Sequence, residues 1–319
     1  MEIGSDTVND MILTVTLNPL LEKRINGETE IYKAGGKGIN VSRQLNFLGI
    51  KNLSHTFLGG KNGKIIRQIL RDENIDFKHI PIKSETRSAV LTLENNKIKT
   101  VFNPNNEIDE NEAAEFKAKL EKMIYNCSAV IFSGSAPSKQ TEDIIPYGIE
   151  LAHKHDKISI VDTYGSHLQN CIDAAPTILH NNVDEVESSL NIKLESEKDK
   201  LDYLNYLYSK GIKLSFITDG KNPTYASKFN FHYKIDNPKI DEKDATGSGD
   251  AFMAGIIYGL ENALVFDDFV KLASALGAAN AATFAVCEVT EEDMNNFSTD
   301  VKLFTLGKKM KIINDSPTI

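Results

Sequence analysis

The sequence predicts an α/β fold with a mostly parallel, doubly wound sheet and helices on both faces. Short β-branched runs alternate along the chain with segments whose apolar residues recur at helical spacing. Parallel strands need crossover connections, usually helices, so this alternation favours a parallel sheet. A hydrophobic content of 41% in 319 residues is sufficient for the core that such a sheet requires.

The first half of the chain opens on an apolar run that the turn-forming pair Asn18-Pro19 closes. A polar stretch and a glycine-rich run then lead into a helix, which Gly49 ends. In order, we expect a strand at 12–17, a helix with Val41, Leu45 and Leu48 on one face, a strand at 53–58 and a helix at 63–73.

From Arg87 to Phe102 the apolar period changes to alternation, with a turn at Asn95-Asn96, and this predicts a β-hairpin. A hairpin that interrupts a strand–helix series is expected to form a lid or accessory sheet. We therefore expect a single domain over residues 1–319, with lid segments at approximately 20–36 and 86–104. The exposed edge of such a lid favours a homodimer formed through it.

The second half returns to the strand–helix alternation and becomes rich in helix towards its end. Alanine and glycine in the last helices allow close packing. We expect a helix at 110–125, strands at 129–132, 159–162, 177–180 and 214–218, and helices at 251–260 and 266–284.

Charge and cysteine content exclude several classes of function. A net charge of −9 argues against a nucleic-acid partner, and an anionic substrate would need a local cluster of donors. The three cysteines form no CxxC pair, which argues against a disulfide framework or a zinc site. Met1 to Asp10 lacks the features of a secretory signal, and no apolar run is long enough to cross a bilayer. We expect a cytoplasmic protein without a membrane partner.

The strongest local motif is Asp-Ala-Thr-Gly-Ser-Gly-Asp-Ala-Phe at 244–252, directly before an apolar helical run. Gly247 and Gly249 permit a tight turn, and the amides from Gly247 to Asp250 would form an anion site at a helix N-terminus. Asp250 could accept the proton of an attacking hydroxyl. On this motif alone, a simple helix cap explains the same residues equally well.

A second motif, Gly-Gly-Lys-Gly-Ile-Asn, lies at 35–40. Gly35 and Gly36 would let a substrate approach the backbone, Lys37 adds a cation, and Asn40 can bond sugar hydroxyls. The alternative is a glycine-rich turn with a solvated lysine.

Together with Asn18-Pro19, these motifs resemble those of the PfkB (ribokinase-like) carbohydrate kinases, in the branch that includes 1-phosphofructokinase and tagatose-6-phosphate kinase. Thr86-Arg87, Ser133-Gly-Ser135, Val161-Asp-Thr163 and Asn182-Val-Asp-Glu185 follow in the family's order. The resemblance spans most of the chain. It implies a ribokinase-like fold and ATP-dependent phosphorylation of a ketose phosphate, with Mg2+. Fructose 1-phosphate, giving fructose 1,6-bisphosphate, is the first candidate, followed by tagatose 6-phosphate and fructose 6-phosphate.

The resemblance also implies roles for individual residues. Asp250 would be the catalytic base, and Gly247, Ser248 and Gly249 would supply the anion hole. Glu185 would support Mg2+ indirectly. Asn18, Glu22, Gly35, Gly36, Lys37, Asn40, Arg87 and Ser135 would bind the sugar phosphate, with Lys37 and Arg87 on its phosphate. Asn182, Thr218, Gly220, Gly247, Gly249 and Asn280 would bind the nucleotide.

The sequence departs from the family pattern at several of these places. Glu22 stands where the family has an aspartate that grips sugar hydroxyls, His180-Asn181 replaces a Lys-Pro pair, and Pro223 replaces a glycine of the nucleotide loop. These changes leave two alternatives open. One is a kinase of the same fold for an unphosphorylated sugar or a nucleoside, and the other is a catalytically silent ligand-binding regulator.

Overall fold

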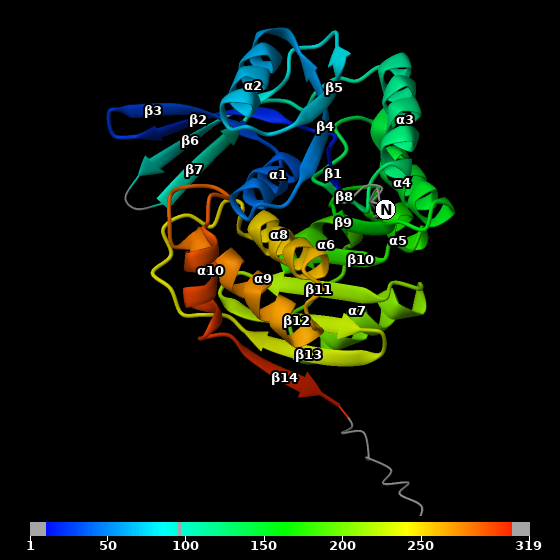
Figure 1. The fold of residues 1–319 in the computed structure, drawn as a ribbon, viewed down its shortest axis with the longest axis vertical. Helices are drawn as coiled ribbons and strands as arrows, with labels where there is room; N and C mark the ends of the chain where they lie inside the picture. Colours follow the sequence, from blue (N-terminus) through cyan, green and yellow to red (C-terminus); the bar gives the residue numbers. More distant parts are fainter. Residues whose placement is uncertain (1–10, 95–96, 308–319) are drawn as a thin grey trace, which may run out of the picture.

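The computed structural model describes residues 11–94 and 97–307. Within them, seven parallel strands and three antiparallel strands form the main sheet, in the order β14-β13-β12-β11-β10-β9-β8-β1-β4-β5 (Figure 1). The parallel strands are β1 (Ile12–Thr16), β4 (Asn52–Gly59), β5 (Phe77–Ile82), β8 (Ala129–Ser133), β9 (Ile158–Asp162), β10 (Ile178–Asn182) and β11 (Leu214–Asp219). The antiparallel strands are β12 (Asn222–Lys228), β13 (Phe231–Asp236) and β14 (Lys302–Leu306).

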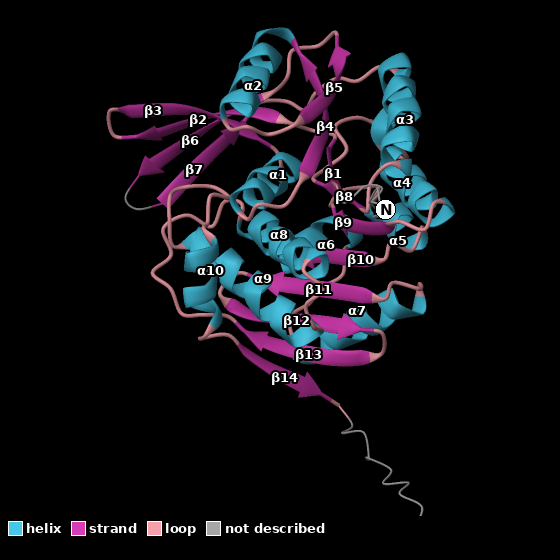
Figure 2. Ribbon diagram, in the orientation of Figure 1, coloured by secondary structure: helices cyan, strands magenta, loops and turns pink. Residues whose placement is uncertain are grey.

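Helices cover both faces of this sheet, as predicted (Figure 2). Successive side chains of β1 point to opposite faces of the sheet, so that Ile12 packs with one group of helices and Leu13 and Val15 pack with the other. The first group is α1 (Lys37–Phe47), α8 (Ser248–Glu261), α9 (Phe266–Ala281) and α10 (Glu291–Ser298). The second is α3 (Glu110–Tyr125), α4 (Ile144–Lys154), α5 (Leu168–Asp173), α6 (Val183–Leu190) and α7 (Glu197–Ser209), with a 3₁₀ turn at Lys139–Thr141.

A second sheet, the accessory sheet, projects from the body beside α2 (Gly60–Asp72) (Figure 1). Its strands are β2 (Leu20–Asn26), β3 (Thr29–Gly35), β6 (Ser88–Glu94) and β7 (Lys97–Phe102), in the order β3-β2-β6-β7. The hairpin predicted at 87–102 is thus β6 and β7, and its turn at Asn95-Asn96 lies outside the described residues, as does Met1 to Asp10.

The expected elements of the main sheet and its helices are present, mostly within two residues of the expected bounds. The helix expected to reach residue 284 ends at Ala281, because the next residues form a loop whose Val286 and Cys287 pack on Gly247. Strands β5 and β12 to β14 were not predicted, whereas β2 and β3 lie in the segment expected at 20–36 as part of the lid, without having been predicted as individual strands. Most of β3 is solvent-exposed and reads as a polar stretch, so its sequence lacks the apolar alternation of a half-buried strand.

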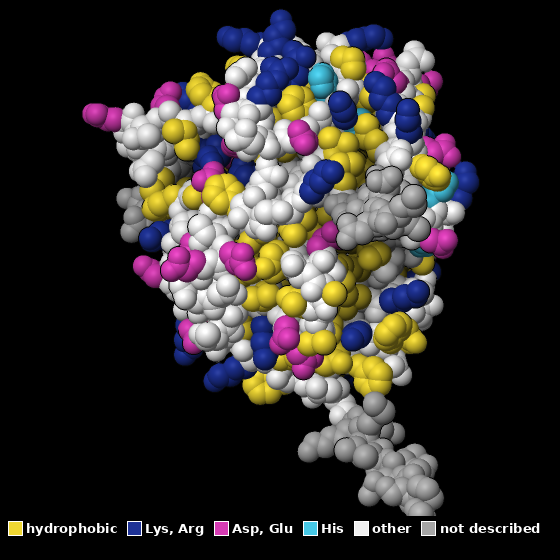
Figure 3. Space-filling model, in the orientation of Figure 1, with side chains coloured by type: hydrophobic (Ala, Val, Ile, Leu, Met, Phe, Trp, Pro, Cys, Tyr) yellow, Lys and Arg dark blue, Asp and Glu magenta, His cyan; other side chains and the backbone are white. Residues whose placement is uncertain are grey.

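Side chains of both charges are interspersed over the face seen in Figure 3. Among the described residues, none of the helices is both long and apolar enough to span a membrane.

Candidate active site

The predicted site residues gather at the carboxyl edge of the parallel strands. Asn18 follows β1, Ser135 follows β8, Asn182 ends β10 and Thr218 lies near the end of β11. Asp162, which was not predicted as a site residue, ends β9 at the same edge. The strand order reverses at β1, which pairs with β4 on one side and β8 on the other. In open α/β sheets, ligands bind at the carboxyl edge next to such a reversal.

Lys37 lies at the centre of this edge, between two carboxylates. Its Nζ donates to Asp162 Oδ1 at 2.9 Å and to Glu185 Oε1 at 2.5 Å, and lies 5.3 Å from the centre of the Tyr164 ring. Burial alone would lower the pKa of Lys37, but Asp162 and Glu185 raise it well above its ordinary value. The ammonium group expected to hold the substrate's phosphate is therefore paired within the protein.

Asp162 is fully buried and connects Lys37 to the next strand. Burial raises its pKa, but Lys37 and His180 outweigh that effect and hold the pKa below the usual range. An ionised carboxylate only accepts hydrogen bonds, so His180 Nδ1, 3.0 Å away, carries its hydrogen toward Asp162. The other ring nitrogen of His180 lies 3.0 Å from Thr218 Oγ1, which joins the acidic centre to the predicted nucleotide side.

Asp250 lies in the first turn of α8 and is 4% exposed. Its Oδ2 accepts a hydrogen bond of 2.8 Å from Asn40 Nδ2. Arg43 donates to Asn40 Oδ1 at 2.8 Å, which fixes the Asn40 amide so that its nitrogen faces Asp250. Burial, with a smaller contribution from Asp162, raises the pKa of Asp250 to about 7, although Lys37 opposes the shift. A base with a pKa near neutrality is suited to accept a proton from a hydroxyl.

The glycine-rich turn before α8 is half-exposed rather than sealed into the core. Gly247 has φ +78°, and a Cβ there would lie 2.6 Å from Val286 Cγ1, so both backbone and space require glycine. The Ser248 amide donates to the Ala245 carbonyl at 3.1 Å. The next amides, of Gly249 and Asp250, belong to the first helical turn, where a helix supplies no acceptor. Free amides and the positive end of the helix dipole are the features that favour an anion at a helix N-terminus.

Asn280, expected at the nucleotide, lies behind this turn and is fully buried. Its Nδ2 donates to the Thr246 carbonyl at 2.9 Å and to Ser248 Oγ at 3.1 Å. Its Oδ1 accepts from the Cys287 amide at 2.7 Å. In this structure Asn280 supports the turn from inside.

A second group of polar side chains surrounds Asn18. Asn18 Nδ2 donates to Ser135 Oγ at 3.1 Å and to Asn105 Oδ1 at 3.0 Å. Arg87 donates to the Asn18 carbonyl at 3.1 Å and to Asn105 Oδ1 at 3.0 Å, and its buried Nε has no partner among the described residues. Lys37 lies next to this group, since a Cβ on Gly134 would be 3.7 Å from Lys37 Cβ. The structure thus places Lys37, Arg87 and Ser135 in one region.

Glu22 is buried against Gly35 and is 7% exposed. A Cβ at Gly35 would lie 2.4 Å from Glu22 Oε1, so glycine is needed for the carboxylate to fit. Gly36, with φ +122°, is the N-cap residue of α1. Burial raises the pKa of Glu22, while Arg24 and Arg43 act in the opposite direction. The longer side chain therefore lies within the protein rather than in open solvent.

Asn182 and Glu185 form a capping box at the start of α6. Asn182 Oδ1 accepts from the Glu185 amide at 2.8 Å, and Glu185 Oε2 accepts from the Asn182 amide at 3.0 Å. Gly220, with φ +52°, is exposed in the turn after β11. Glu185 is thus held by its own helix and by Lys37.

The described residues contain no group of three or more His, Cys, Asp or Glu side chains arranged to hold a metal ion. The donors nevertheless suit Mg2+, which prefers oxygen ligands and binds through one or two carboxylates together with substrate phosphates. Asp162 Oδ2 is buried and has no hydrogen-bond partner in the described part of the chain. The oxygen chemistry here fits a magnesium ion that arrives with a nucleotide.

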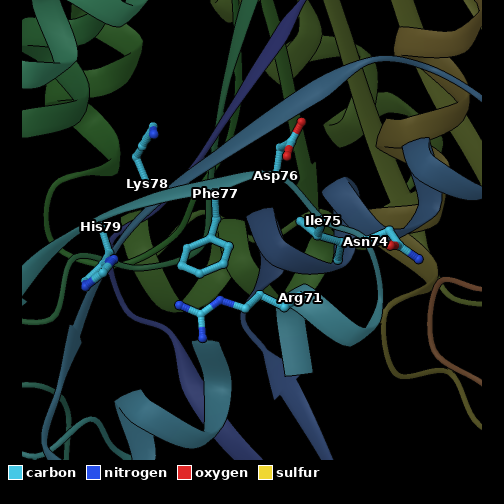
Figure 4. A pocket seen from close by; sticks show the side chains of 7 residues that line it. All are labelled: Arg71, Asn74, Ile75, Asp76, Phe77, Lys78 and His79. Atoms are coloured by element: carbon cyan, nitrogen blue, oxygen red, sulfur yellow. The ribbon is translucent and has the colours of Figure 1, made fainter. Parts of the chain in front are cut away.

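An open groove of about 640 Å3 lies away from these residues, along the outer edge of the main sheet at β5. Phe77 and His79 project to one side of the strand and Lys78 to the other (Figure 4). The groove is lined by Arg71, Asn74, Ile75, Asp76, Phe77, Lys78 and His79, none of which is a predicted site residue.

Sequence reasoning missed several polar residues at the site. Arg43 orients Asn40, while Asn105 and Asn106 bond Asn18, Arg87 or both. Arg43 follows Asn40 by three residues on a predicted helix, a spacing that could have indicated their contact. Asn105 and Asn106 carry no comparable signal, because they lie in a loop far along the chain from Asn18.

A doubly wound sheet whose carboxyl edge holds a buried carboxylate beside an anion-binding turn is an architecture suited to phosphoryl transfer to a small molecule. The sequence matches the pfkB family of carbohydrate kinases over residues 3–293, and the chain belongs to this family.

Relatives with assigned names span almost the whole chain. A tagatose-6-phosphate kinase of Staphylococcus epidermidis is 28% identical over 317 residues, covering 95% of this chain and 99% of that protein. A 1-phosphofructokinase of Borreliella burgdorferi is 32% identical over 293 residues, covering 87% and 94%.

Solved structures share the fold. A protein described as a possible 1-phosphofructokinase of Thermotoga maritima has a TM-score of 0.85 and 21% identity, covering 93% of this chain and 100% of that one. Phosphofructokinase-2 of Escherichia coli, in complex with substrates and products, has a TM-score of 0.81 and 20% identity, covering 91% and 98%. The expected ribokinase-like fold is confirmed.

Proposed function

We propose that the protein transfers the γ-phosphoryl group of ATP to a hydroxyl of a ketose phosphate. The observation that carries this proposal is Asp250, a buried carboxylate whose pKa is about 7, at the start of the helix whose first amides form an anion site. The names of the relatives supply the class of acceptor. Fructose 1-phosphate is the first candidate, followed by tagatose 6-phosphate and fructose 6-phosphate.

Asp250 accepts the proton of the attacking hydroxyl, since Asn40 orients its carboxylate and burial keeps its basicity high. The amides of Gly249 and Asp250 stabilise charge on the migrating phosphoryl group. Bound Mg2+ would neutralise charge on the nucleotide phosphates, and Glu185 would hold it indirectly. Thr218, which contacts His180, and Gly220, in the turn after β11, line the nucleotide side.

Arg87 and Ser135 bind the phosphate that the acceptor already carries, with Asn18 and Asn105 setting their positions. The buried, unpartnered Nε of Arg87 supports this assignment, because an uncompensated guanidinium nitrogen favours an anionic ligand. Lys37 can bind the same phosphate only if its ion pair with Asp162 or with Glu185 breaks. In the paired state of this structure, Lys37 instead moderates the pKa of Asp250.

The accessory sheet would act as a lid that excludes water, which competes with the sugar as acceptor. Exposed apolar residues on its strands, Ile31, Tyr32, Val90, Val101 and Phe102, support a homodimer formed through this sheet. Light scattering on the wild type and on a V101S/F102S variant tests this, with a dimer expected only for the wild type. We also place the protein in the cytoplasm, consistent with three buried, unpaired cysteines.

A substrate panel tests the proposed function. Fructose, fructose 1-phosphate, fructose 6-phosphate and tagatose 6-phosphate are compared with MgATP in one coupled assay, and phosphorus NMR identifies the product. We expect turnover with a ketose phosphate and little with fructose. Preference for fructose would favour the kinase for an unphosphorylated sugar, and absence of turnover with all four would favour the silent regulator.

A further inference from the structure

A buried arginine of the accessory sheet contacts the glycine-rich turn directly. Arg24 lies on β2, and its Nη2 forms an ion pair with Asp244 Oδ2, 220 residues later in the chain. The Arg24 and Asp244 side chains are 9% and 2% exposed. The second oxygen of Asp244, Oδ1, accepts a hydrogen bond of 2.9 Å from the Thr246 amide. One carboxylate therefore joins the accessory sheet to the backbone of the turn.

The same arginine also reaches toward the acceptor side of the site. Arg24 Nη1 lies 3.7 Å from Glu22 Oε2, and Glu22 packs against Gly35. Nη1 is buried and has no hydrogen-bond partner within residues 11–94 and 97–307. Arg24 thus lies between Glu22, assigned to the sugar, and Asp244, which begins the turn assigned to the phosphoryl group.

The turn depends on this support. No side chain caps α8, because its N-cap is Gly247, which needs positive φ. The Thr246 carbonyl is held by Asn280, and the Thr246 amide by Asp244. A buried carboxylate that loses its cation is strongly destabilised, so Asp244 without Arg24 would turn toward water and release the Thr246 amide.

We propose that Arg24 is a positioning residue for phosphoryl transfer, which sets the turn at 244–247 through Asp244 and links that turn to Glu22 on the acceptor side. This inference rests on the proposed function. As a consequence, the accessory sheet forms part of the phosphoryl site. The amides of Gly249 and Asp250 are correctly positioned for the phosphoryl group only when Arg24 on β2 contacts Asp244.

A double-mutant cycle tests the inference. Arg24→Gln, Asp244→Asn and the double variant are compared with Lys23→Gln, which alters the preceding residue of the same strand and breaks a surface pair with Glu30. We expect each single substitution at Arg24 or Asp244 to lower kcat by about 100-fold, the effect of a displacement near 1 Å. We expect the KM for MgATP to change less than threefold, and the double variant to be no slower than the slower single variant.

A purely structural role predicts a different pattern. In that case the substitutions would lower the melting temperature and leave kcat of the folded enzyme unchanged. Alternatively, the fold decreases in kcat of the two single variants would multiply in the double variant. Either result would overturn the inference. Arg24→Lys, which keeps the cation, should recover kcat to within tenfold of wild type, whereas Lys23→Gln should match wild type. If Arg24→Gln does not fold, Arg24→Lys and the charge-neutral double variant carry the test.

Hydrogen exchange separates this inference from the proposed function. Peptides that cover residues 244–252 should exchange at least tenfold faster in Arg24→Gln than in Lys23→Gln. Unchanged exchange in that segment would overturn the inference even where the wild type phosphorylates a ketose phosphate. If the wild type phosphorylates none of the sugars, faster exchange would still support the link from Arg24 through Asp244 to the turn, while the proposed function, and with it the role of that link in phosphoryl transfer, would be refuted.

Discussion

Asp250 should make the stability of the protein depend on pH, in a direction that its burial fixes. Burial raises the pKa of Asp250 from 3.8 to about 7, with Asp162 adding to the effect and Lys37 opposing it. The folded protein therefore binds this proton more tightly than the unfolded chain. The stability gained from protonated Asp250 is complete below about pH 4 and is lost as the pH rises to about 7. A difference of roughly three pH units corresponds to about 4 kcal/mol.

Asp250→Asn removes this titration while preserving the size of the side chain. Between pH 5 and pH 8 the wild type should lose about 3 kcal/mol relative to the variant. A 319-residue protein unfolds with an entropy of about 0.7 kcal/mol per kelvin, so the difference in melting temperature should change by about 4 °C. Differential scanning calorimetry of both proteins at pH 5, 6, 7 and 8 measures this change. The melting temperature of the variant should rise relative to that of the wild type as the pH rises.

Asp162→Asn supplies a control of opposite sign. Lys37 and His180 hold the pKa of Asp162 below its usual range, so its ionised form stabilises the protein at neutral pH and loses that effect as the pH falls toward acid. This variant should be less stable than the wild type at pH 8, with a smaller deficit in acid. A constant difference in melting temperature between wild type and Asp250→Asn across this range would refute the reasoning for Asp250.

Three further predictions concern the site. kcat/KM should rise with pH through about 7, and Lys37→Met should move this limb to higher pH in a rate–pH profile, because Lys37 lowers the pKa of Asp250. Gly247→Ala should cost about 3 kcal/mol in urea unfolding, whereas Gly249→Ala, whose methyl group would meet only His180 at 3.5 Å, should cost less than about 1 kcal/mol. Arg87→Gln should raise the KM for the ketose phosphate by about tenfold in steady-state kinetics and leave that for MgATP unchanged.

The elements of the fold that could be predicted are those whose secondary structure follows from a local sequence pattern. Strands β1, β8 and β9 are short runs rich in β-branched residues, and nearly all of their residues are buried because helices cover both faces of the sheet there. The helix at 110–125 begins at an aspartate capping box. Strands β13 and β14 and most of β3 are partly exposed, so tertiary pairing rather than local pattern determines them.

The candidate site shows the same division. The turn at 247–250 could be located from glycine spacing, because positive φ at Gly247 is a local requirement. The partners of Lys37 lie 125 and 148 residues further along, and the partner of Arg24 lies 220 residues away. Local sequence patterns cannot predict contacts between residues so far apart in the chain. The ion pairs of Lys37 and the link from β2 to the turn could therefore be found only in the folded structure.

The most direct test of the account is single-turnover phosphoryl transfer by Asp250→Asn to the best ketose phosphate of the panel. With both substrates bound at near wild-type affinity by calorimetry, we expect the transfer rate to fall by about 1,000-fold. A rate within tenfold of wild type under the same conditions would contradict the assignment of Asp250 as the base.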